Sequence, residues 1–364
     1  MGTHQELLVE ENSFVPPTYD AEFHDAQNEA AWIHRMPYRM LGNTGLPLSL
    51  LSYGGSALAN YYSDNASRKE SIEAIQLALR SGVNYIETGP WYGPSEEIIG
   101  EALKDVPRKT FYISTKAGRY YTPGWEGRFD FTAQKVLNSV EASLEKLGLK
   151  YVDIIQVHDV EFCLDQEILL KETLPALESV VKAGKAKYIG ITSYCLESMK
   201  NLIEKSPVKI DNILSYSRYN FHDISLESYV PYFESKNVGV INASPVAMGL
   251  YTTRGPPAWH AASETVKKLA KQVSDLTLAK GLSIEHAALG FGLRPRNTKI
   301  ASTLVSMPTI GILQENLEIV STPYTVEDEL FYNSIFKIFK DGLQNEPGHW
   351  EGKELLDYKK WMGV

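Results

Sequence analysis

Four ionisable side chains stand at or just after the ends of short apolar segments, and together they could move a proton to or from a carbonyl oxygen. Glu87 ends one such segment, Tyr92 follows it five residues later, and Lys116 and His158 end the next two. A phenol with a reference pKa of about 10 is a poor acid near neutral pH unless a neighbouring ammonium stabilises its phenolate. Lys116 could supply that ammonium while Glu87 balances its charge. His158 could then orient a carbonyl oxygen beside Tyr92.

Taken one at a time, these residues have simpler interpretations. A Glu or Lys at a strand end is usually a solvated rim charge. A single His after an apolar strand is more often a hydrogen-bonded structural residue, and a single Tyr is often a core residue with a wet hydroxyl. An acid, a phenol, an amine and an imidazole at successive strand ends favour a shared chemical role.

The elements that would position this set alternate along the chain. Runs typical of buried strands recur at about 48–54, 83–87, 110–115, 151–157, 187–191, 211–216, 238–243 and 301–306. Amphipathic, helix-length segments lie near 68–81, 95–104, 131–147, 166–183, 196–205, 226–236, 262–280 and 313–320. This alternation predicts an α/β fold with a parallel sheet, and eight pairs favour a single closed (β/α)8 TIM barrel. An open sheet would call for a Gly-x-Gly-x-x-Gly turn after its first strand, and the sequence has none.

The charge distribution divides the chain into three predicted parts. The 364 residues carry a net charge of −9, but residues 1–34 hold seven acids and no Lys or Arg, which leaves −2 for the rest. We therefore predict an acidic N-terminal arm over 1–34, a barrel over 35–325 and a C-terminal helix and tail over 326–364 that packs on the barrel. The segment 37–46 predicts a hairpin that plugs the barrel. Apolar residues in the arm predict that it packs partly on the barrel or on a partner: Leu7, Leu8, Val9, Phe14, Val15, Tyr19, Phe23, Trp32 and Ile33.

Several classes of protein are disfavoured by what the sequence lacks. No run of basic residues is longer than two, so we expect no nucleic-acid partner. No apolar run approaches the roughly 20 residues of a membrane span, and no basic and apolar leader opens the sequence, so we expect no membrane association and a cytoplasmic location. Cys163 and Cys195 form no C-x-x-C pair, and no other metal-binding motif occurs, so we expect no metal.

Five segments resemble one family of enzymes. They are Leu41–Leu46, Lys116–Tyr120, Tyr151–Asp159, Ala243–Leu250 and Gly255–His260. Over residues 36 to 320 the chain resembles the aldo-keto reductases, nicotinamide-dependent (β/α)8 oxidoreductases, and within them the plant-type L-galactose dehydrogenase group. The resemblance implies that Tyr92 is the general acid in carbonyl reduction or the base in alcohol oxidation. The family carries Asp where this chain has Glu87, and one additional methylene matters because errors of about 1 Å can cost about 100-fold in rate.

The resemblance also implies that a dinucleotide lies extended across the barrel mouth. It implies that Thr192 and Ser193, after the fifth strand, contact the cofactor and that Ser215 binds the nicotinamide carboxamide. It also implies that residues 244–250 form the loop that binds the pyrophosphate. The full set of implied cofactor residues is Gly55, Thr192, Ser193, Ser215, Ala243, Ser244, Pro245, Val246, Ala247, Met248, Gly249, Leu250, Val305, Ser306, Glu315 and Asn316. NADPH-preferring members often carry Lys or Arg within the segment matching 305–312, and none occurs here. This favours NAD slightly over NADP, although Arg296 or Lys299 could substitute.

Loop aromatics could wall a substrate pocket or could simply pack the loops: Trp91, Tyr121, Trp125 and Trp259. We predict an NAD(P)-dependent oxidoreductase that acts on a small-molecule carbonyl, either a sugar, as an aldose 1-dehydrogenase, or a small aldehyde. The alternative is a cofactor-binding redox sensor with weak or no turnover, and a third possibility is Schiff-base chemistry at Lys116. By resemblance we expect a monomer.

Overall fold

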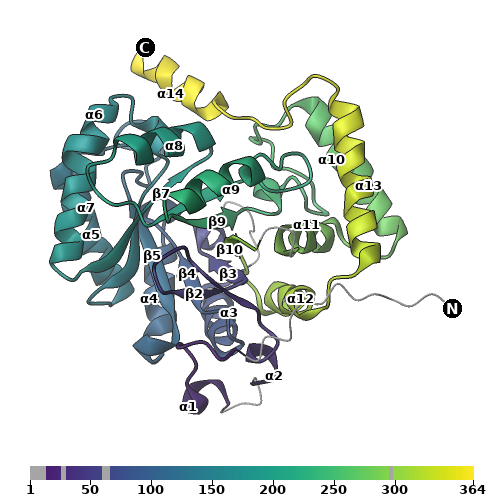
Figure 1. Ribbon diagram of the computed structural model, residues 1–364, viewed down its shortest axis with the longest axis horizontal. Coiled ribbons are helices and arrows are strands. Elements are labelled where there is room, and N and C mark those ends of the chain that lie inside the picture. Colours follow the sequence, from purple (N-terminus) through teal and green to yellow (C-terminus); the bar gives the residue numbers. More distant parts are fainter. Residues whose placement is uncertain (1–13, 26–29, 60–65, 295–297) are drawn as a thin grey trace.

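Eight parallel strands form a closed barrel, which confirms the predicted (β/α)8 fold (Figure 1). The computed structural model describes residues 14–25, 30–59, 66–294 and 298–364. Each strand pairs with the next along the chain, and the last pairs with the first, in the order β10-β3-β4-β5-β6-β7-β8-β9. The strands are β3 (Leu51–Gly54), β4 (Tyr85–Glu87), β5 (Tyr112–Ala117), β6 (Val152–Val157), β7 (Ala186–Ser193), β8 (Asn212–Tyr216), β9 (Gly239–Ala243) and β10 (Ile300–Val305).

A layer of helices surrounds the strands. These helices are α3 (Arg68–Arg80), α4 (Ser95–Leu103), α5 (Ala133–Leu147), α7 (Leu174–Lys182), α8 (Leu196–Lys205), α9 (Leu226–Ser235), α11 (Ile284–Leu293) and α12 (Ile310–Ser321). A short α6 (Gln166–Ile168) and a π-helical turn over Leu169–Thr173 precede α7. Helix starts follow ordinary capping chemistry, since the side chains of Ser67 and Ser283 accept backbone N–H groups of α3 and α11.

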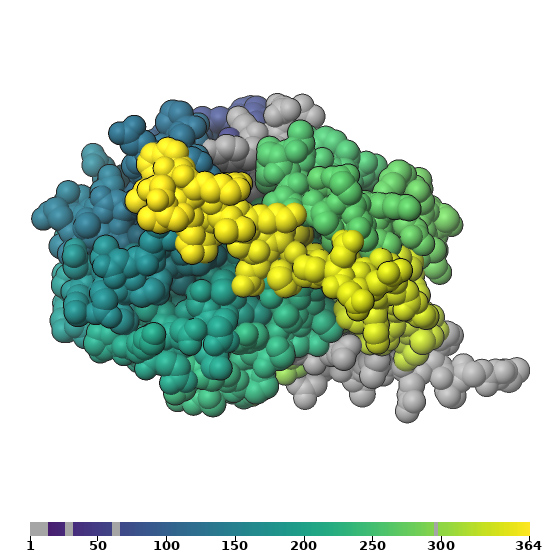
Figure 2. Space-filling view, turned by 90° about the horizontal axis from the view of Figure 1, so that it is seen from above, coloured from purple at the N-terminus to yellow at the C-terminus, as the bar shows by residue number. Residues whose placement is uncertain are grey.

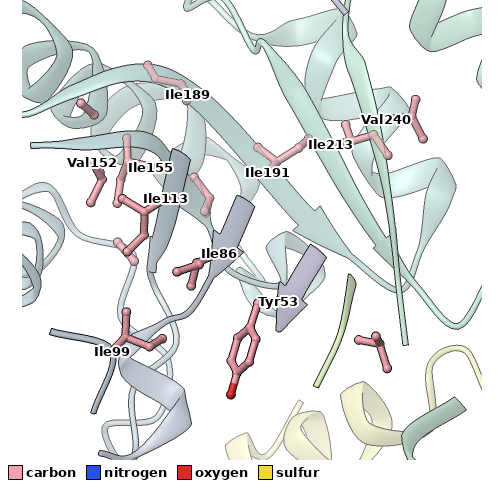
Figure 3. Packing of buried hydrophobic residues seen from close by; sticks show 14 of the residues in the cluster. Tyr53, Ile86, Ile99, Ile113, Val152, Ile155, Ile189, Ile191, Ile213 and Val240 are labelled. Carbon is pink, nitrogen blue, oxygen red and sulfur yellow. The ribbon is translucent and has the colours of Figure 1, made fainter. Parts of the chain in front are cut away.

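The main core lies between the strands and the helices. Successive strand side chains point to opposite faces, and one set of branched residues, including Ile113, Ile155, Ile191 and Val240, packs against the helices (Figure 3). Burying one such side chain contributes about 1.5–3 kcal/mol. The opposite set fills the inside of the barrel. The barrel therefore has a packed interior beneath its mouth.

The predicted hairpin closes the amino-terminal end of the barrel. Its strands β1 (Tyr38–Met40) and β2 (Pro47–Ser49) pair antiparallel. Leu41, Leu46 and Leu48 cluster with side chains from the inside of the barrel. The turn needs glycine, because Gly42 has φ +49° and a Cβ there would lie 2.6 Å from the backbone N of Gly239. The apolar run predicted as one strand over 48–54 supplies both β2 and β3.

The helix predicted near 262–280 is confirmed as α10 (Glu264–Ala279), but it does not belong to the layer that covers the barrel. It packs outside the barrel against α13 (Val326–Leu343), and α11, which was not predicted, covers the sheet instead (Figure 1). Helix α11 is buried on several sides because it lies between the barrel and this outer pair. A helix buried on several sides lacks an amphipathic stripe, which is the signal that the prediction used.

The C-terminal segment contains two helices rather than one helix and a tail. After α13 the chain turns back, and α14 (Lys353–Met362) lies across the carboxyl-terminal face of the barrel, between its earlier and later halves (Figure 2). Within the described residues, no helix is long and apolar enough to cross a membrane.

The described part of the N-terminal arm packs on the opposite end of the barrel. It includes α1 (Ala21–His24) and α2 (Ala30–Ile33), and Thr18 and Ile33 are buried. Asn84, just before β4, donates to Thr18 Oγ1 over 3.0 Å. Leu7, Leu8 and Val9, which we expected to help this packing, lie outside the described residues. The boundaries of the three parts remain a prediction.

Candidate active site

The carboxyl ends of three neighbouring strands bring the four ionisable residues together. Glu87 is the last residue of β4, Lys116 is the second-last residue of β5, and His158 follows β6. Tyr92 lies on the 3₁₀ turn Pro90–Tyr92. Lys116 Nζ forms an ion pair with the Glu87 carboxylate and donates to Tyr92 Oη over 3.0 Å. Its third hydrogen bond is to the carbonyl of Thr88, at 2.9 Å. The longer glutamate therefore still reaches the lysine.

This group lies in a buried environment that suits proton transfer. Lys116 is only 1% exposed. Burial lowers the pKa of Lys116 well below its usual value, and the nearby Asp159 carboxylate opposes that change. The Glu87 carboxylate, in direct contact, provides a counter-charge for the ammonium. A cation one hydrogen bond from a phenol stabilises the phenolate, so this geometry can activate Tyr92 as an acid or a base.

His158 completes the group. Its ring meets the Tyr92 ring edge to face, with centroids 5.6 Å apart. Burial lowers the pKa of His158 well below its usual value. The neighbouring Asp159 carboxylate opposes this change, and the positive charges of Lys116 and Arg119 add to it. The imidazole is therefore neutral near pH 7. Its Nδ1 is buried without a hydrogen-bond partner in the part of the chain that the structure describes, so the ring has capacity to bind a ligand oxygen.

A cleft of about 1260 Å³ opens above these residues. Many of the residues implied by resemblance as cofactor contacts line it: Thr192, Ala243, Ser244, Val246, Met248, Gly249, Val305, Ser306, Glu315 and Asn316. The others lie behind its surface: Gly55, Ser193, Ser215, Pro245, Ala247 and Leu250. Gly54 lines the cleft in place of Gly55, whose N–H donates to the Glu87 carbonyl over 2.8 Å.

The predicted pyrophosphate loop forms a tight turn at the edge of this cleft. Ala247 and Met248 are consecutive and have left-handed backbone, with φ of 50° and 53°. Their N–H groups are used inside the loop, because Ala247 donates to the Ser244 carbonyl and Met248 donates to Ser244 Oγ, each over 2.9 Å. The Ser215 hydroxyl at the end of β8 is fully buried and has no partner among the described residues, but it does not line the cleft. The dinucleotide contacts therefore remain a prediction.

The predicted substrate aromatics divide into two groups. Trp91, Tyr121 and Trp259 line the cleft. Trp125 does not, because it packs against Tyr358 of α14 with ring centroids 5.5 Å apart. Trp125 is therefore a packing residue that holds α14 in place.

Several residues of the cleft were not predicted from the sequence. Asp159 follows His158 directly, Arg119 lies three residues beyond Lys116, and Glu161 lines the same wall. Trp350 and Glu354 reach the cleft from the C-terminal segment. Closeness to the strand ends was a usable signal for Asp159 and Arg119. No local signal exists for Glu354, because only the path of the chain after α13 brings it to the mouth.

Comparisons with known proteins agree with this geometry. The model of the aldo/keto reductase family matches residues 50–330, and the chain belongs to that family. L-galactose dehydrogenase of Arabidopsis thaliana is 40% identical over 293 residues, which cover 79% of this chain and 89% of the relative. The predicted resemblance is confirmed. The protein is thus an oxidoreductase of a nicotinamide-dependent family.

Other relatives and a solved structure extend the comparison. D-arabinose 1-dehydrogenase of Saccharomyces cerevisiae is 29% identical over 289 residues, 76% of this chain and 84% of the relative. D-threo-aldose 1-dehydrogenase of a Pseudomonas species is 30% identical over 234 residues, 58% of this chain and 70% of the relative. The holo form of an aldo-keto reductase from Bacillus halodurans shares the fold, with a TM-score of 0.67 and 24% identity, over 82% of this chain and 96% of that one.

Proposed function

We propose that the protein is an NAD-dependent aldose 1-dehydrogenase that oxidises the cyclic form of a sugar at its anomeric carbon. The observation that carries this proposal is the hydrogen bond between Lys116 Nζ and Tyr92 Oη in the cleft. A bound nicotinamide would supply the hydride acceptor for the anomeric carbon. Tyr92, as phenolate, takes the proton of the anomeric hydroxyl, and His158 orients the oxygen. The product is a lactone.

The sugar is favoured over a simple aldehyde by three ionisable side chains near His158 and by the relatives. A sugar presents several hydroxyls, and Arg119, Asp159 and Glu161 line the cleft beside His158. Trp91 and Tyr121 offer rings on which a sugar face can stack. The three relatives named above are dehydrogenases of L-galactose, D-arabinose and D-threo-aldoses.

The choice of NAD over NADP is supported by the charges around the cleft. The segment 305–312 has no Lys or Arg. Glu285 and Glu315 both line the cleft. They lie at one end of it: burial lowers the pKa of His286, the residue after Glu285, and the nearby Asp328 and Glu315 carboxylates oppose that change. Two carboxylates disfavour a 2′-phosphate. Of the two cations considered as substitutes, Lys299 pairs with Glu234 near the amino-terminal end of the barrel, and Arg296 lies outside the described residues.

Thermal unfolding with each cofactor tests this choice. A ligand that binds the native state raises the unfolding temperature according to its concentration relative to Kd. We expect a larger rise with NAD(H) than with NADP(H) at equal concentration. Because Arg254 also lines the cleft, R254Q is measured in parallel. An equal or larger rise with NADP(H) that R254Q abolishes would overturn the assignment and identify Arg254 as the phosphate contact.

The variant Y92F tests the reaction itself. We expect the rate of NAD reduction with an aldose to fall by about 10²–10⁴-fold, as for loss of a general acid or base, while cofactor affinity stays within about twofold. Affinity is measured by quenching of intrinsic tryptophan fluorescence. Equal and very low turnover in wild type and Y92F, with tight cofactor binding in both, would favour the redox-sensing alternative. Borohydride trapping with substrate is expected to leave Lys116 unmodified, which excludes a Schiff base.

A further inference from the structure

Asp159 occupies an unusual position next to the reacting centre. It follows His158 directly and has left-handed backbone with φ 56°, a conformation that costs free energy for a residue with a side chain. Its Oδ2 lies 3.7 Å from His158 Nε2. Asp159 is 3% exposed, yet it lines the cleft. The chain therefore holds a buried carboxylate beside the catalytic imidazole, and the reaction proposed above does not use it.

The surroundings of Asp159 keep it ionised and fixed in place. Arg119 Nη1 donates to Oδ2 over 2.5 Å, and the Asp159 N–H donates to Thr192 Oγ1 over 3.0 Å. Burial raises the pKa of Asp159, but the Arg119 guanidinium, through its charge and its hydrogen bond, and the nearby Lys116 hold it below its ordinary value. A carboxylate offers about four lone-pair sites, so Oδ1 and Oδ2 retain the capacity to accept a hydrogen bond from a ligand.

Arg119 connects this carboxylate to the C-terminal helix. Its other terminal nitrogen, Nη2, donates to Glu354 of α14 over 2.5 Å. The guanidinium also lies over the Trp91 ring, 4.4 Å from its centroid. Helix α14 crosses this face of the molecule (Figure 2), and the Glu354 side chain is 42% exposed. Glu354 thus anchors Arg119 from the solvent side while Asp159 anchors it from inside.

We propose that Asp159 selects substrates that carry a hydroxyl on the carbon next to the reacting carbon, and that Glu354 is a positioning residue acting through Arg119. This inference rests on the proposed function. The reacting oxygen must lie between Tyr92 Oη and the His158 ring. In a vicinal diol, the neighbouring hydroxyl oxygen lies about 3 Å from the reacting one, roughly one hydrogen-bond length. That places it within reach of Asp159, because the carboxylate adjoins the same imidazole.

The test compares an aldose with its 2-deoxy analogue in wild type and in D159N. We expect wild type to prefer the aldose in kcat/KM by about 10- to 100-fold, the value of one hydrogen bond to a charged group. D159N is expected to reduce that preference to about threefold or less, mainly by lowering kcat/KM for the aldose. A residue that only supports the fold would lower kcat/KM for both sugars equally and leave the preference unchanged.

Two variants in the C-terminal segment provide the matched comparison. E354Q is expected to reduce the preference about threefold to tenfold, as a weakened charge contact would. D341N removes a carboxylate of α13 that is 61% exposed, pairs with Lys337 and does not line the cleft, and it is expected to leave the preference unchanged. If thermal unfolding shows that D159N does not fold, the E354Q result decides, because loss of preference there supports the proposal and an unchanged preference overturns it.

The outcomes separate this inference from the function on which it rests. Equal kcat/KM for both sugars in wild type, or equal losses for both in D159N, would overturn the role of Asp159 while the dehydrogenase stands. Absence of NAD reduction with every aldose and deoxy sugar in wild type would overturn the proposed function and this inference with it.

Discussion

Two carboxylates at opposite ends of the barrel differ in how fully their oxygens are bound. Near the amino-terminal end, Asp153 is fully buried and accepts hydrogen bonds from Arg108, Lys187 and the backbone N–H of Ile113. At the carboxyl-terminal mouth, by contrast, Glu161 Oε2 is buried and has no partner in the described part of the chain, and His158 Nδ1 has none either. Each such atom costs about 1–3 kcal/mol.

The difference indicates where the chain gains stability and where it keeps capacity for a ligand. The amino-terminal end has an apolar plug, formed by Leu41, Leu46 and Leu48, and the Asp153 carboxylate with its three donors. The mouth has a lysine held between a carboxylate and a phenol, and an imidazole nitrogen without a partner among the described residues. Such a trade of stability for function is common at active sites. Substitutions at the two ends should therefore affect different measurements.

The largest effect is expected from neutralising the ion pair at the mouth. The double variant E87Q/K116M removes both charges while keeping similar volumes. We expect turnover to fall by about 10³-fold, because Tyr92 loses its activating ammonium. We expect the free energy of unfolding in urea to stay the same or rise by about 1–4 kcal/mol, since a buried ion pair is often no more stable than its neutral isostere.

The single variant K116M is the control for that prediction. It leaves the Glu87 carboxylate buried and without its cation, so it should be inactive and also less stable than the double variant. If the double variant unfolds at lower urea than wild type, the ion pair serves the fold as well as the chemistry. The contrast between the two ends would then be weaker than we infer.

The opposite result is expected at the amino-terminal end. D153A leaves the Ile113 N–H without its acceptor and removes the partner of two cations, so we expect a loss of about 2–4 kcal/mol in unfolding free energy. The kcat of the folded protein should remain within about twofold of wild type. D341A, at an exposed pair with Lys337, is the control and should change stability by less than about 0.5 kcal/mol. A fall in kcat for D153A would show that the two ends are coupled.

The sequence was sufficient to predict the barrel and its four ionisable residues, because both depend on local pattern. The strand runs are short, apolar and regularly spaced, and in this fold the strand ends must meet at one mouth. Glu87, Lys116 and His158 could therefore be placed from their positions alone. Helix α11 was missed because burial on several sides removes the amphipathic pattern.

The remaining site residues depend on tertiary structure. Glu354 reaches Arg119 only because the chain turns back after α13, and no periodicity or motif encodes that path. Trp125 was predicted as a substrate contact because aromatic loop residues suit both pockets and packing, and only the position of Tyr358 on α14 decides between them. Ser215 lies within β8 and Ala247 begins the 3₁₀ turn Ala247–Gly249, and neither residue lines the cleft.

The pH dependence of stability should report on the mouth, through Glu161. Burial and the charge of Asp159 raise the pKa of Glu161 from 4.5 to about 8. The folded protein therefore retains a proton that the unfolded chain loses near pH 4.5, so the unfolding free energy should fall as pH rises from about 4.5 to 8. The slope is at most about 1.4 kcal/mol per pH unit. E161Q should lack this pH-dependent part of the unfolding free energy, which urea unfolding of both proteins from pH 5.5 to 8.5 measures. The prediction is contradicted if the unfolding free energies of wild type and E161Q differ by the same amount at every pH in this range.

The smallest effect is expected where the N-terminal arm meets the barrel. Thr18 is buried, and its hydroxyl accepts from Asn84 Nδ2, while the Asn84 Oδ1 accepts from the Ser49 N–H in the hairpin. Thr18→Val keeps the shape but removes the acceptor, so we expect a loss of about 1 kcal/mol in unfolding free energy and no change in kcat. Thr322→Val, at an exposed hydroxyl, should change neither quantity. If Thr18→Val is as stable as wild type, this hydrogen bond between the arm and Asn84 does not stabilise the folded protein. A loss of unfolding free energy near the expected value would mean that Asn84 links the arm and the hairpin to the start of β4, at the closed amino-terminal end of the barrel.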